Sequence, residues 1–570
     1  MSVRAMAMTM AAAGAAALAG AGTAAAATPN WHPGTHPSAP SGGAQPAQSV
    51  RLALGIGSSG QATLLYGAVK GALYAVSRTS PQGAWGGAQP WLASAAVSAG
   101  GSPGGGLAVA VGGKVTALWS TSSNGLANAT GSTTGGGAAS IVPGQSGTPN
   151  DLSIFTSPQG VDYGYSVGTS IYAASAPQRS PLPPASVIAP PAAEGAPGLQ
   201  TAVDSAGNQT AAWTANGQVL VATRAAETGT WSAPAALPGS SALPFALTVA
   251  GNGKAAIAYA ANVVTGSFSG TSTFGQPITL PYQASVTLAV ATRTGPTAPF
   301  GGPQPVFTYA PPAPATLDQA TALSAVSLPM AASAATGGGK VAVAWVVPPV
   351  NGAPGPQYLL TRGTLGGTLP APTALPGVDE DVTSWTLTGL DTAVDPQGNA
   401  AFVIGGTETQ GDVDTVRAST STPNAPAWKA LKDIAGCKQG SGVAGGPTVV
   451  ASPTGGLVAA WACQGSGSAT SAQGLVGLAA FDTFGPPVIS YTLSGGTKKA
   501  TARFTLGEAA SYTLTATKGG STVKLSGSAK ARQAVSRTLT LAPGTWKVTL
   551  KGTLSTGNAT SVAKNVSVSG

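Results

Sequence analysis

The stretch "DSAGNQTAAW", residues 204–213, returns in altered form along most of the 570-residue chain. Each copy opens on Asp, Ser or another small residue, has Gly three places later, and runs on through small and β-branched residues. Asp or Ser first, often Pro second, and Gly fourth are the preferences of a type I turn, and the run that follows is typical of a β-strand. Asp204 and Asp395 are therefore predicted to be turn residues rather than catalytic ones. The other seven copies are "DPQGNAAFVI" (395–404), "SPTGGLVAAW" (452–461), "GSSGQATLLY" (57–66), "TGGGKVAVAW" (336–345), "AGNGKAAIAY" (250–259), "SPGGGLAVAV" (102–111) and "SPQGVDYGYS" (157–166).

Each copy is followed by a second β-like run, such as "GQVLVATRA" (217–225), and by a short tail, such as "WSAPAAL" (231–237). A unit thus offers about four short strands in roughly 46 residues, which is the size of one propeller blade. Residues 48–486 are therefore predicted to form an all-β fold, a seven- or eight-bladed β-propeller of about eight repeats. No segment after the first 27 residues sustains a helical apolar period, so we expect no helices there.

The opening stretch superficially resembles the Asp-box hairpin of sialidase-like propellers, S-x-D-x-G-x-x-W. It departs from that pattern, because Asp204 does not stand two places before Gly207 and no Ser stands two places before Asp204. The repeat region as a whole resembles secreted bacterial β-propeller proteins of the sialidase-like and WD40-like class without their catalytic residues. This resemblance implies a fold and no active site.

The first 27 residues follow the pattern of an export signal, with Arg4 before an apolar run that ends in small residues near Ala27. No second long apolar segment follows, so we expect no transmembrane segment in the mature chain and an extracellular or cell-wall-associated location. Residues 28–47 are rich in Pro, Gly and Ser and are predicted to be a flexible linker. This linker holds the only two histidines, His32 and His36, so the folded region has no histidine for triad or metal chemistry.

The repeat ends before residues 487–570. This region has about seven runs of alternating polar and apolar residues separated by Gly-containing turns, which predicts an Ig-like β-sandwich. The segment "LAPGTWKVT" (541–549) resembles the "LAPGxYxLT" element of Ig-like or fibronectin-like modules that end many secreted proteins of high-GC bacteria.

Charge is concentrated in this last region. Residues 488–570 hold eight Lys and three Arg against one acidic residue, which gives +10, while the rest of the chain is near −1. Such asymmetry favours attachment to an anionic envelope polymer, and a merely solubilising surface is the alternative. Specific nucleic-acid binding is not expected, because few aromatics could stack on bases. The residues predicted to contact an anionic polymer are Lys498, Lys499, Arg503, Lys518, Lys524, Lys530, Arg532, Arg537, Lys547 and Lys551.

The long connections of the repeats emerge on one face of a propeller, opposite the Asp204-type turns. They include 263–284 and 308–327, and such excess length is where binding commonly evolves. An acidic cluster falls on this face: Asp379, Glu380, Asp381, Asp412 and Asp414 are candidate ligands of a Ca²⁺ cofactor. An ordinary solvated acidic loop is the alternative. The predicted ligand-binding set is Asp379, Asp381, Trp385, Glu408, Asp412 and Asp414, with Trp385 placed to stack on a sugar.

The only two cysteines, Cys437 and Cys463, are predicted to form a disulfide in an oxidising compartment. Arginines recur at one place in the third strand of four repeats, and we interpret them as repeat inheritance at exposed strand ends. These residues are Arg78, Arg224, Arg293 and Arg362.

These patterns together predict a secreted or cell-wall-associated, non-catalytic binding or scaffold protein, monomeric, with a glycan or another extracellular protein as partner of the propeller. The alternative is a secreted glycan-active enzyme, a hydrolase or lyase, that uses carboxylates of the same face.

Overall fold

The computed structural model describes the chain in the ranges that follow. These are residues 30–32 and 52–570, apart from 68–71, 82, 93–105, 122–124, 145–146, 179–180, 190–197, 227–228, 273–274, 325–327, 348–356, 376–384, 409–414, 437–442, 464–475, 483–487, 508, 531–532 and 555–557. The chain divides into two compact units, Trp31–Phe481 and a second that contains Asp482–Gly570. Among the described residues, no helix is long and apolar enough to cross a membrane.

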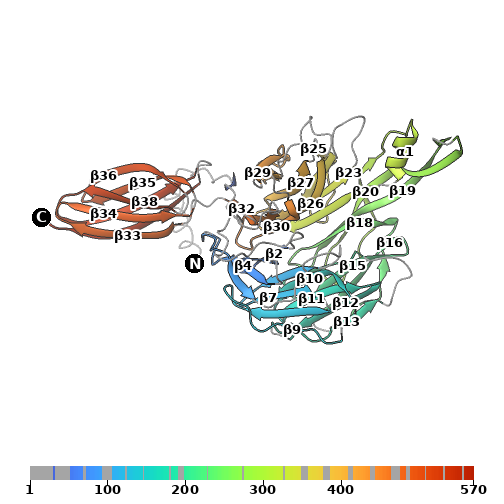
Figure 1. The fold of residues 1–570 in the computed structure, drawn as a ribbon, viewed down its shortest axis with the longest axis horizontal. Helices are drawn as coiled ribbons and strands as arrows, with labels where there is room; N and C mark the ends of the chain where they lie inside the picture. Colours follow the sequence, from blue (N-terminus) through green and yellow to red (C-terminus); the bar gives the residue numbers. More distant parts are fainter. Residues whose placement is uncertain are drawn as a thin grey trace, which may run out of the picture. The chain divides into compact units, whose positions relative to one another are not determined.

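The described residues of the first unit form eight four-stranded sheets, seven of them made of consecutive strands in antiparallel order (Figure 1). The first four are β2–β5 (Leu52–Ile56, Ala62–Gly67, Leu73–Arg78, Gln89–Leu92), β6–β9 (Leu107–Val111, Val115–Ser120, Leu126–Gly131, Ser140–Ile141), β10–β13 (Pro149–Ser157, Gly160–Val167, Ser170–Ala176, Ser186–Ala189) and β14–β17 (Gln200–Val203, Gln209–Ala215, Gln218–Arg224, Ala235–Ala236).

The next three sheets are β18–β21 (Ser240–Val249, Ala255–Thr271, Pro277–Arg293, Gln304–Tyr309), β22–β25 (Ala331–Gly337, Lys340–Val347, Gln357–Thr364, Thr373–Leu375) and β26–β29 (Trp385–Val394, Ala400–Glu408, Thr415–Ser421, Lys432–Gly436). The eighth joins β30 (Val443–Ala451), β31 (Leu457–Cys463) and β32 (Val476–Asp482) to β1 (Asn30–Trp31). Helix α1 (Leu317–Ser324) lies between the fifth and sixth sheets in sequence.

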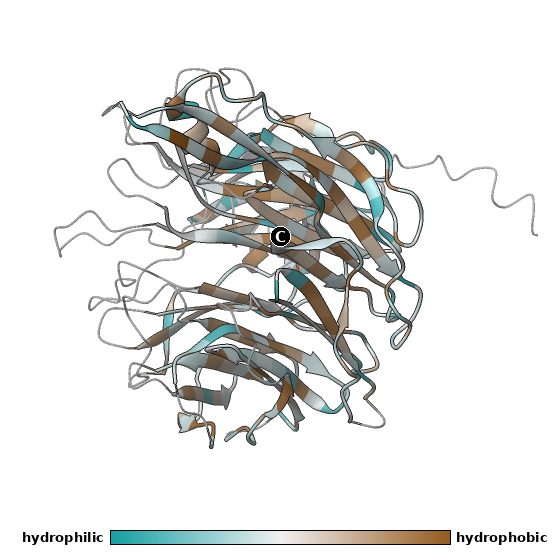
Figure 2. Ribbon diagram, turned by 90° about the vertical axis from the view of Figure 1, so that its right-hand side faces the viewer, coloured by the Kyte–Doolittle hydropathy of each residue, from teal (hydrophilic) through white to brown (hydrophobic). Residues whose placement is uncertain are grey.

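The sheets form a closed ring. The first strands of successive sheets lie next to one another, and β30 of the eighth sheet lies next to β2 of the first. Each neighbouring pair of sheets shares one buried apolar cluster, so eight small cores replace a single large one. In Figure 2 many of the hydrophobic residues lie on the strands. This arrangement is a β-propeller, and the sheet topology resolves the predicted seven or eight blades as eight.

The eighth sheet is closed by the beginning of the chain. β1 pairs with β32 as the outermost strand, and the backbone N–H of His32 donates to the carbonyl of Ala480 at 2.7 Å. The ring of Trp31 packs on Phe481 with centroids 5.4 Å apart. The predicted flexible linker, residues 28–47, is therefore corrected at residues 30–32, where His32 is buried. The sequence did not predict this strand, because a strand of two residues is too short to show an alternation of polar and apolar residues.

The repeated turn has the predicted form. The N–H of Gly207 donates to the carbonyl of Asp204 at 3.1 Å, and Gly207 has a φ of 90°, which glycine adopts at no steric cost. The carboxylate of Asp204 accepts from the backbone N–H groups of Ala206 and Asn208, both at 2.9 Å. Asp395 makes the same kind of turn. Both aspartates are buried and structural.

Five of the eight copies end in an aromatic, and these side chains fill space between sheets. Trp213, Trp345 and Trp461 are at most 2 % exposed. In the second repeat the predicted register is wrong: 107–111 is the first strand, β6, and not the second. The residue equivalent to Trp213 is Trp119, six places after Gly113, and it too is buried. The glycine-rich approach to β6 obscured this register.

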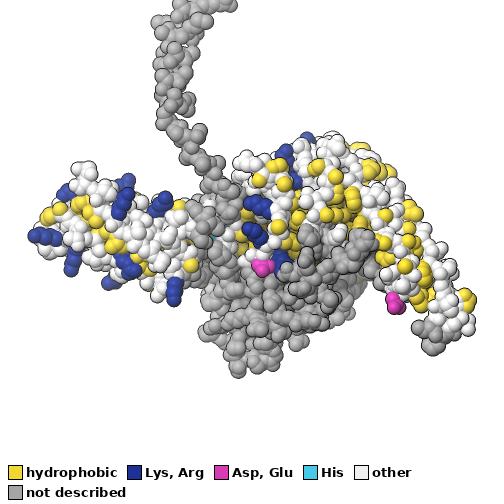
Figure 3. All heavy atoms as spheres, turned by 90° about the horizontal axis from the view of Figure 1, so that it is seen from above, with side chains coloured by type: hydrophobic (Ala, Val, Ile, Leu, Met, Phe, Trp, Pro, Cys, Tyr) yellow, Lys and Arg dark blue, Asp and Glu magenta, His cyan; other side chains and the backbone are white. Residues whose placement is uncertain are grey.

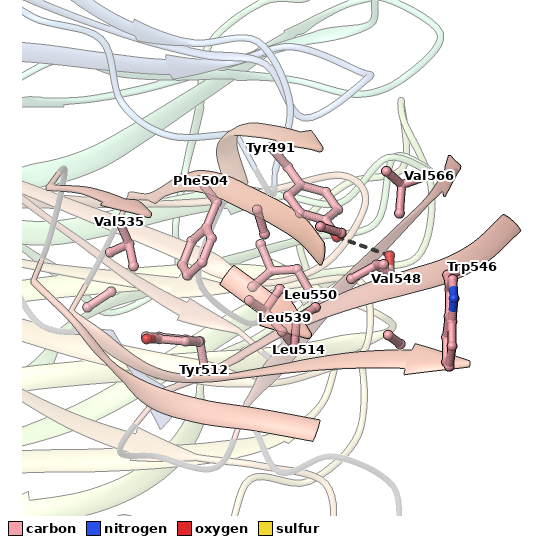
Figure 4. Close-up of a cluster of buried hydrophobic side chains, with 14 of the residues drawn as sticks. Tyr491, Phe504, Tyr512, Leu514, Val535, Leu539, Trp546, Val548, Leu550 and Val566 are labelled. Atoms are coloured by element: carbon pink, nitrogen blue, oxygen red, sulfur yellow. Dashed lines mark hydrogen bonds between the residues drawn. The ribbon is translucent and has the colours of Figure 1, made fainter. Parts of the chain in front are cut away.

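The second unit is a two-layered sandwich of seven strands. One sheet has the order β33-β34-β37 (Val488–Gly496, Lys499–Leu506, Ala534–Thr540) and the other β36-β35-β38-β39 (Ser521–Ala529, Ala510–Lys518, Gly544–Thr553, Ala559–Val568). Figure 4 shows the core between the two sheets. The ring of Phe504 packs edge-on against that of Tyr512, with the ring centroids 4.9 Å apart. The hydroxyl of Tyr491 in β33 donates to the carbonyl of Val548 in β38 at 3.0 Å, which ties the two sheets together (Figure 4).

Candidate functional site

The face that carries the connections from second to third strand, and from each sheet to the next, is called the loop face here; the Asp204-type turns lie on the opposite, turn face. Of the predicted ligand-binding residues, Trp385 begins β26 and Glu408 ends β27, and the register pairs them directly across the ladder. Asp379, Glu380, Asp381, Asp412 and Asp414 lie outside the described residues. The calcium site therefore stays a prediction, and the described residues contain no group of three potential metal ligands.

The predicted disulfide also stays untested. Cys463 ends β31 opposite Val443, while Cys437 lies outside the described residues.

The most extended element of the loop face is a hairpin where the sequence predicts a long loop. Residues 263–284 are largely strand, because β19 and β20 each continue for 17 residues. β18 pairs with β19 only as far as Ala261, and β21 pairs with β20 only from Val286 onward. Residues 264–271 and 277–285 therefore form a two-stranded ribbon beyond the sheet, which we call the arm. Alternating β-favouring residues such as "SFS" and "ITLPY" were the signal for it.

The second predicted loop, 308–327, contains α1, which corrects the expectation of no helix. Helix α1 starts at a capping arrangement: Thr316 accepts from the backbone N–H of Gln319 at 3.3 Å, and the Gln319 side chain accepts from the N–H of Ala315 at 2.8 Å. The T-x-x-Q spacing with Asp318 in the first turn was the available signal. Ala320 is fully buried, and α1 contacts both β19 and β20, the two strands that continue into the arm.

The recurring arginines act on the turn face, and their interpretation as exposed residues is wrong. Arg293 is 1 % exposed and donates to the carbonyl of Gly253 at 3.1 Å and to the hydroxyl of Thr210 at 2.6 Å, in the neighbouring sheet. Burial lowers the pKa of Arg293 to about 10, and the charge of Asp204 opposes this shift. Arg362 similarly donates to Gly398 and, at 2.7 Å, to Ser421 of the next sheet. Arg293 and Arg362 thus link adjacent sheets on the turn face.

The first strands carry a second set of ties. Asp391 in β26 accepts from the backbone N–H of Val449 at 2.9 Å and from the hydroxyl of Thr448 at 3.0 Å, both in β30. Gln200 in β14 bonds to the backbone of β18 in the same way. Part of the surface of Asp391 is accessible, but its carboxylate is enclosed by protein. Burial raises the pKa of Asp391 to about 6, against hydrogen bonds from Val449, Thr392, Thr448 and Ser333 that lower it.

The buried carboxylates of the described first unit therefore serve the fold. Asp204 and Asp395 shape turns, and Asp391 joins sheets. Asp162 accepts from Gln209 at 2.6 Å and lies 3.8 Å from a guanidinium nitrogen of Arg224. Any ligand-binding carboxylate of the predicted set would come from Glu408 or from the residues outside the described ranges.

The basic residues of the second unit are distributed over both of its sheets. Lys547 and Lys551 lie on either side of Thr549 in β38, and Lys524 lies in the same cross-strand row as Thr515 and Thr549. These three lysines share the outer face of the four-stranded sheet, with Thr and Ser between them. Figure 3 shows Lys and Arg side chains spread over this unit.

The remaining predicted polymer contacts point elsewhere. Lys499 and Arg503 are on β34 of the opposite sheet. Arg537 donates to the hydroxyl of Tyr512 at 2.6 Å, and Lys518 donates to the carbonyl of Pro543. Lys498 stands in the turn before β34, Lys530 is exposed after β36, and Arg532 lies outside the described residues. The nine described residues do not form one compact patch: Lys524, Lys547 and Lys551 share the outer face of one sheet, and Lys499 and Arg503 share the outer face of the other.

No protein-family model and no curated protein matches the chain. Solved structures that resemble it include the Dos1 propeller (8 % identity, TM-score 0.40, covering 80 % of this chain and 95 % of that one). Others are the Aleuria aurantia lectin in complex with Fucalpha1-6GlcNAc (11 %, 0.32, 69 % and 98 %) and the Penicillium chrysogenum alpha-L-arabinanase complexed with arabinobiose (8 %, 0.30, 64 % and 92 %). The propeller assignment rests on the sheet topology rather than on these similarities.

Proposed function

We propose that the chain is an exported glycan-binding protein in which the loop face of the propeller recognises the glycan. The carrying observation is that the additions to the simple four-stranded repeat gather on this face: the arm, helix α1 and the Trp385–Glu408 pair all belong to it. A rigid ring that elaborates one face is the usual design of a binding scaffold. Trp385 and Glu408, which pair in the register of β26 and β27, are residue types that can supply an apolar surface for a sugar ring and an acceptor for its hydroxyls.

We further propose that the second unit is an Ig-like module that attaches the protein to an anionic polymer of the cell envelope. Three lysines on one face of the sheet support this proposal: Lys524, Lys547 and Lys551. The residues between them are Thr and Ser, which carry no negative charge that would repel a bound anion. Such binding is electrostatic and therefore falls with ionic strength.

A glycan array together with a hydrolysis screen tests the first proposal on the full chain. Binding without turnover, weakened at least about tenfold by Trp385→Ala, is expected, since an aromatic contact to a ligand contributes about 0.5–1.5 kcal/mol beyond the area that it buries. Trp231→Ala is the matched control, because Trp231 lies at the turn-face end of its sheet, opposite Arg224. Turnover by the wild type would favour a glycan-active enzyme, and absence of glycan binding would refute the proposal.

Binding to an isolated teichoic acid tests the second proposal. The Lys524→Ser, Lys547→Ser, Lys551→Ser variant is expected to lose most binding at 50 mM salt, while Lys499→Ser with Arg503→Ser, on the opposite sheet, loses less. Equal effects of the two variants would assign the binding to net charge alone, and wild-type binding unchanged up to 500 mM salt would refute attachment by charge.

A further inference from the structure

The arm has two chemically different faces. Gly266, Phe268 and Gly270 of β19 pair with Tyr282, Leu280 and Ile278 of β20 in direct register, so these six residues lie on one side. All six are partly buried, whereas Ser, Thr and Pro of the other side are exposed. The ribbon extends about 27 Å beyond the sheet, since eight residues of β19 rise roughly 3.4 Å each. It therefore offers a narrow, apolar strip within a hydroxyl-rich ribbon.

The two glycines are what give this strip its shape. A Cβ at Gly266 would lie 2.8 Å from Cζ of Tyr282, and one at Gly270 would lie 2.7 Å from Cε1 of Phe268. Each ring therefore occupies the space where the neighbouring side chain would stand, and spreads over the ribbon backbone. Any side chain larger than hydrogen at 266 or 270 must displace a ring, because real Cβ atoms are not found at such distances.

The arm carries no charge. Residues 262–284 contain no Lys, Arg, His, Asp or Glu in a run of Ser, Thr, Gly, Pro and apolar residues. On the space-filling view the end of the propeller that holds α1 and the arm is almost entirely uncharged (Figure 3). A surface of this kind attracts neither anionic nor cationic polymers and favours a neutral ligand.

The edges and the size of the strip narrow the choice of ligand further. Pro277 and Pro281 remove two backbone donors from β20, so the addition of a partner strand at this edge is disfavoured. A whole large aromatic side chain buries only about 150–250 Å². Four partly exposed apolar side chains thus offer far less than the ~800 Å² per partner of a stable protein interface.

We propose that the apolar strip of the arm, centred on Tyr282 and Phe268, is a subsite for a neutral saccharide chain. The inference rests on the proposed glycan-binding function and adds the ligand class and the place. The rings would stack on the apolar faces of sugar rings, and the Ser and Thr hydroxyls along the ribbon would bond to sugar hydroxyls. Because no charged residue takes part, the binding would be insensitive to salt.

The test uses the full chain on an array of neutral glycans, with affinity measured by calorimetry for the glycans that bind. Phe268→Ala with Tyr282→Ala is expected to weaken binding about tenfold or more, since two stacking contacts are lost. Gly266→Val is expected to weaken it as well, because its side chain displaces Tyr282. Ser269→Ala with Thr279→Ala, a directly paired couple on the other side of the ribbon, is the matched control and should change affinity far less. Wild-type affinity should stay within twofold from 50 to 500 mM salt.

The outcomes separate the two proposals. Neutral-glycan binding that is unchanged in the Phe268→Ala, Tyr282→Ala variant overturns the arm subsite and leaves the loop face as the glycan-binding surface. Binding of charged glycans alone also overturns the neutral subsite. Failure to bind any glycan removes both proposals. Because the arm projects beyond the sheet, the variants should keep the wild-type unfolding midpoint, and a lowered midpoint would assign these side chains to the core.

Discussion

Asp391 predicts an unusual pH dependence of the propeller. Its folded pKa is about 6, raised mainly by burial, against a value near 3.9 in an unfolded chain. Between these two values the folded state binds more protons than the unfolded state, so the free energy of unfolding decreases as pH rises toward and through 6. At about 1.4 kcal/mol per pKa unit, protonated Asp391 contributes at most about 3 kcal/mol to the free energy of unfolding. Most of this contribution is present at pH 4, and it is lost above pH 7.

The change Asp391→Asn removes this ionisation while it keeps an oxygen that can accept from Val449 and Thr448. We expect the variant to be about 1–3 kcal/mol more stable than wild type at pH 8, with about a third of this difference remaining at pH 4.5. Urea unfolding followed by tryptophan fluorescence at both values measures the difference. Asp433→Asn is the control: Asp433 is 60 % exposed and pairs with Arg417 at 2.7 Å, so its loss should cost under about 1 kcal/mol, with no benefit at pH 8. Parallel pH profiles for wild type and Asp391→Asn would refute the reasoning.

Two further predictions concern how the ring is held. Asp395→Ala should increase amide exchange at Gly456, because the Asp395 carboxylate accepts from the backbone N–H of Gly456 in the next sheet at 2.9 Å, whereas Asp204→Ala should leave exchange at Gly456 unchanged; equal exchange in the two variants would show that this tie contributes nothing. Trp31→Ala should lower the free energy of unfolding by about 1–3 kcal/mol through lost packing on Phe481, and it should increase amide exchange in β32 more than in β3; uniform exchange would contradict a local role in closure.

The repeated part of the fold was predictable because the residues that form each turn lie next to one another in the sequence of that repeat. Asx-type hydrogen bonds at Asp204 and Asp395 depend on neighbours within five residues, so sequence alone contains them. The same holds for the strand-terminal aromatics, whose burial follows from their place in the alternation. The register failed only in the second repeat, where glycine-rich sequence removes that information.

What could not be predicted depends on contacts between distant segments. The buried place of Arg293 depends on Thr210, 83 residues away, and a strand-end arginine looks exposed when its own sheet alone is considered. The sequence predicts a loop over the arm because the segment is longer than chain reversal requires, although the alternation of its residues is visible. The acidic cluster around Asp379 and Asp412 stays a prediction, while the Trp385–Glu408 pairing follows from the register of β26 and β27.

The closing strand has a consequence for the order in which the protein can be made. Asn30 and Trp31 precede their partner β32 by more than four hundred residues, so β1 can pair only after the rest of the propeller has been synthesised. With processing near Ala27, the new N-terminus would stand only two residues before this strand. If the sequence-predicted cleavage near Ala27 takes place, removal of the leader and pairing of β1 with β32 would involve the same few residues.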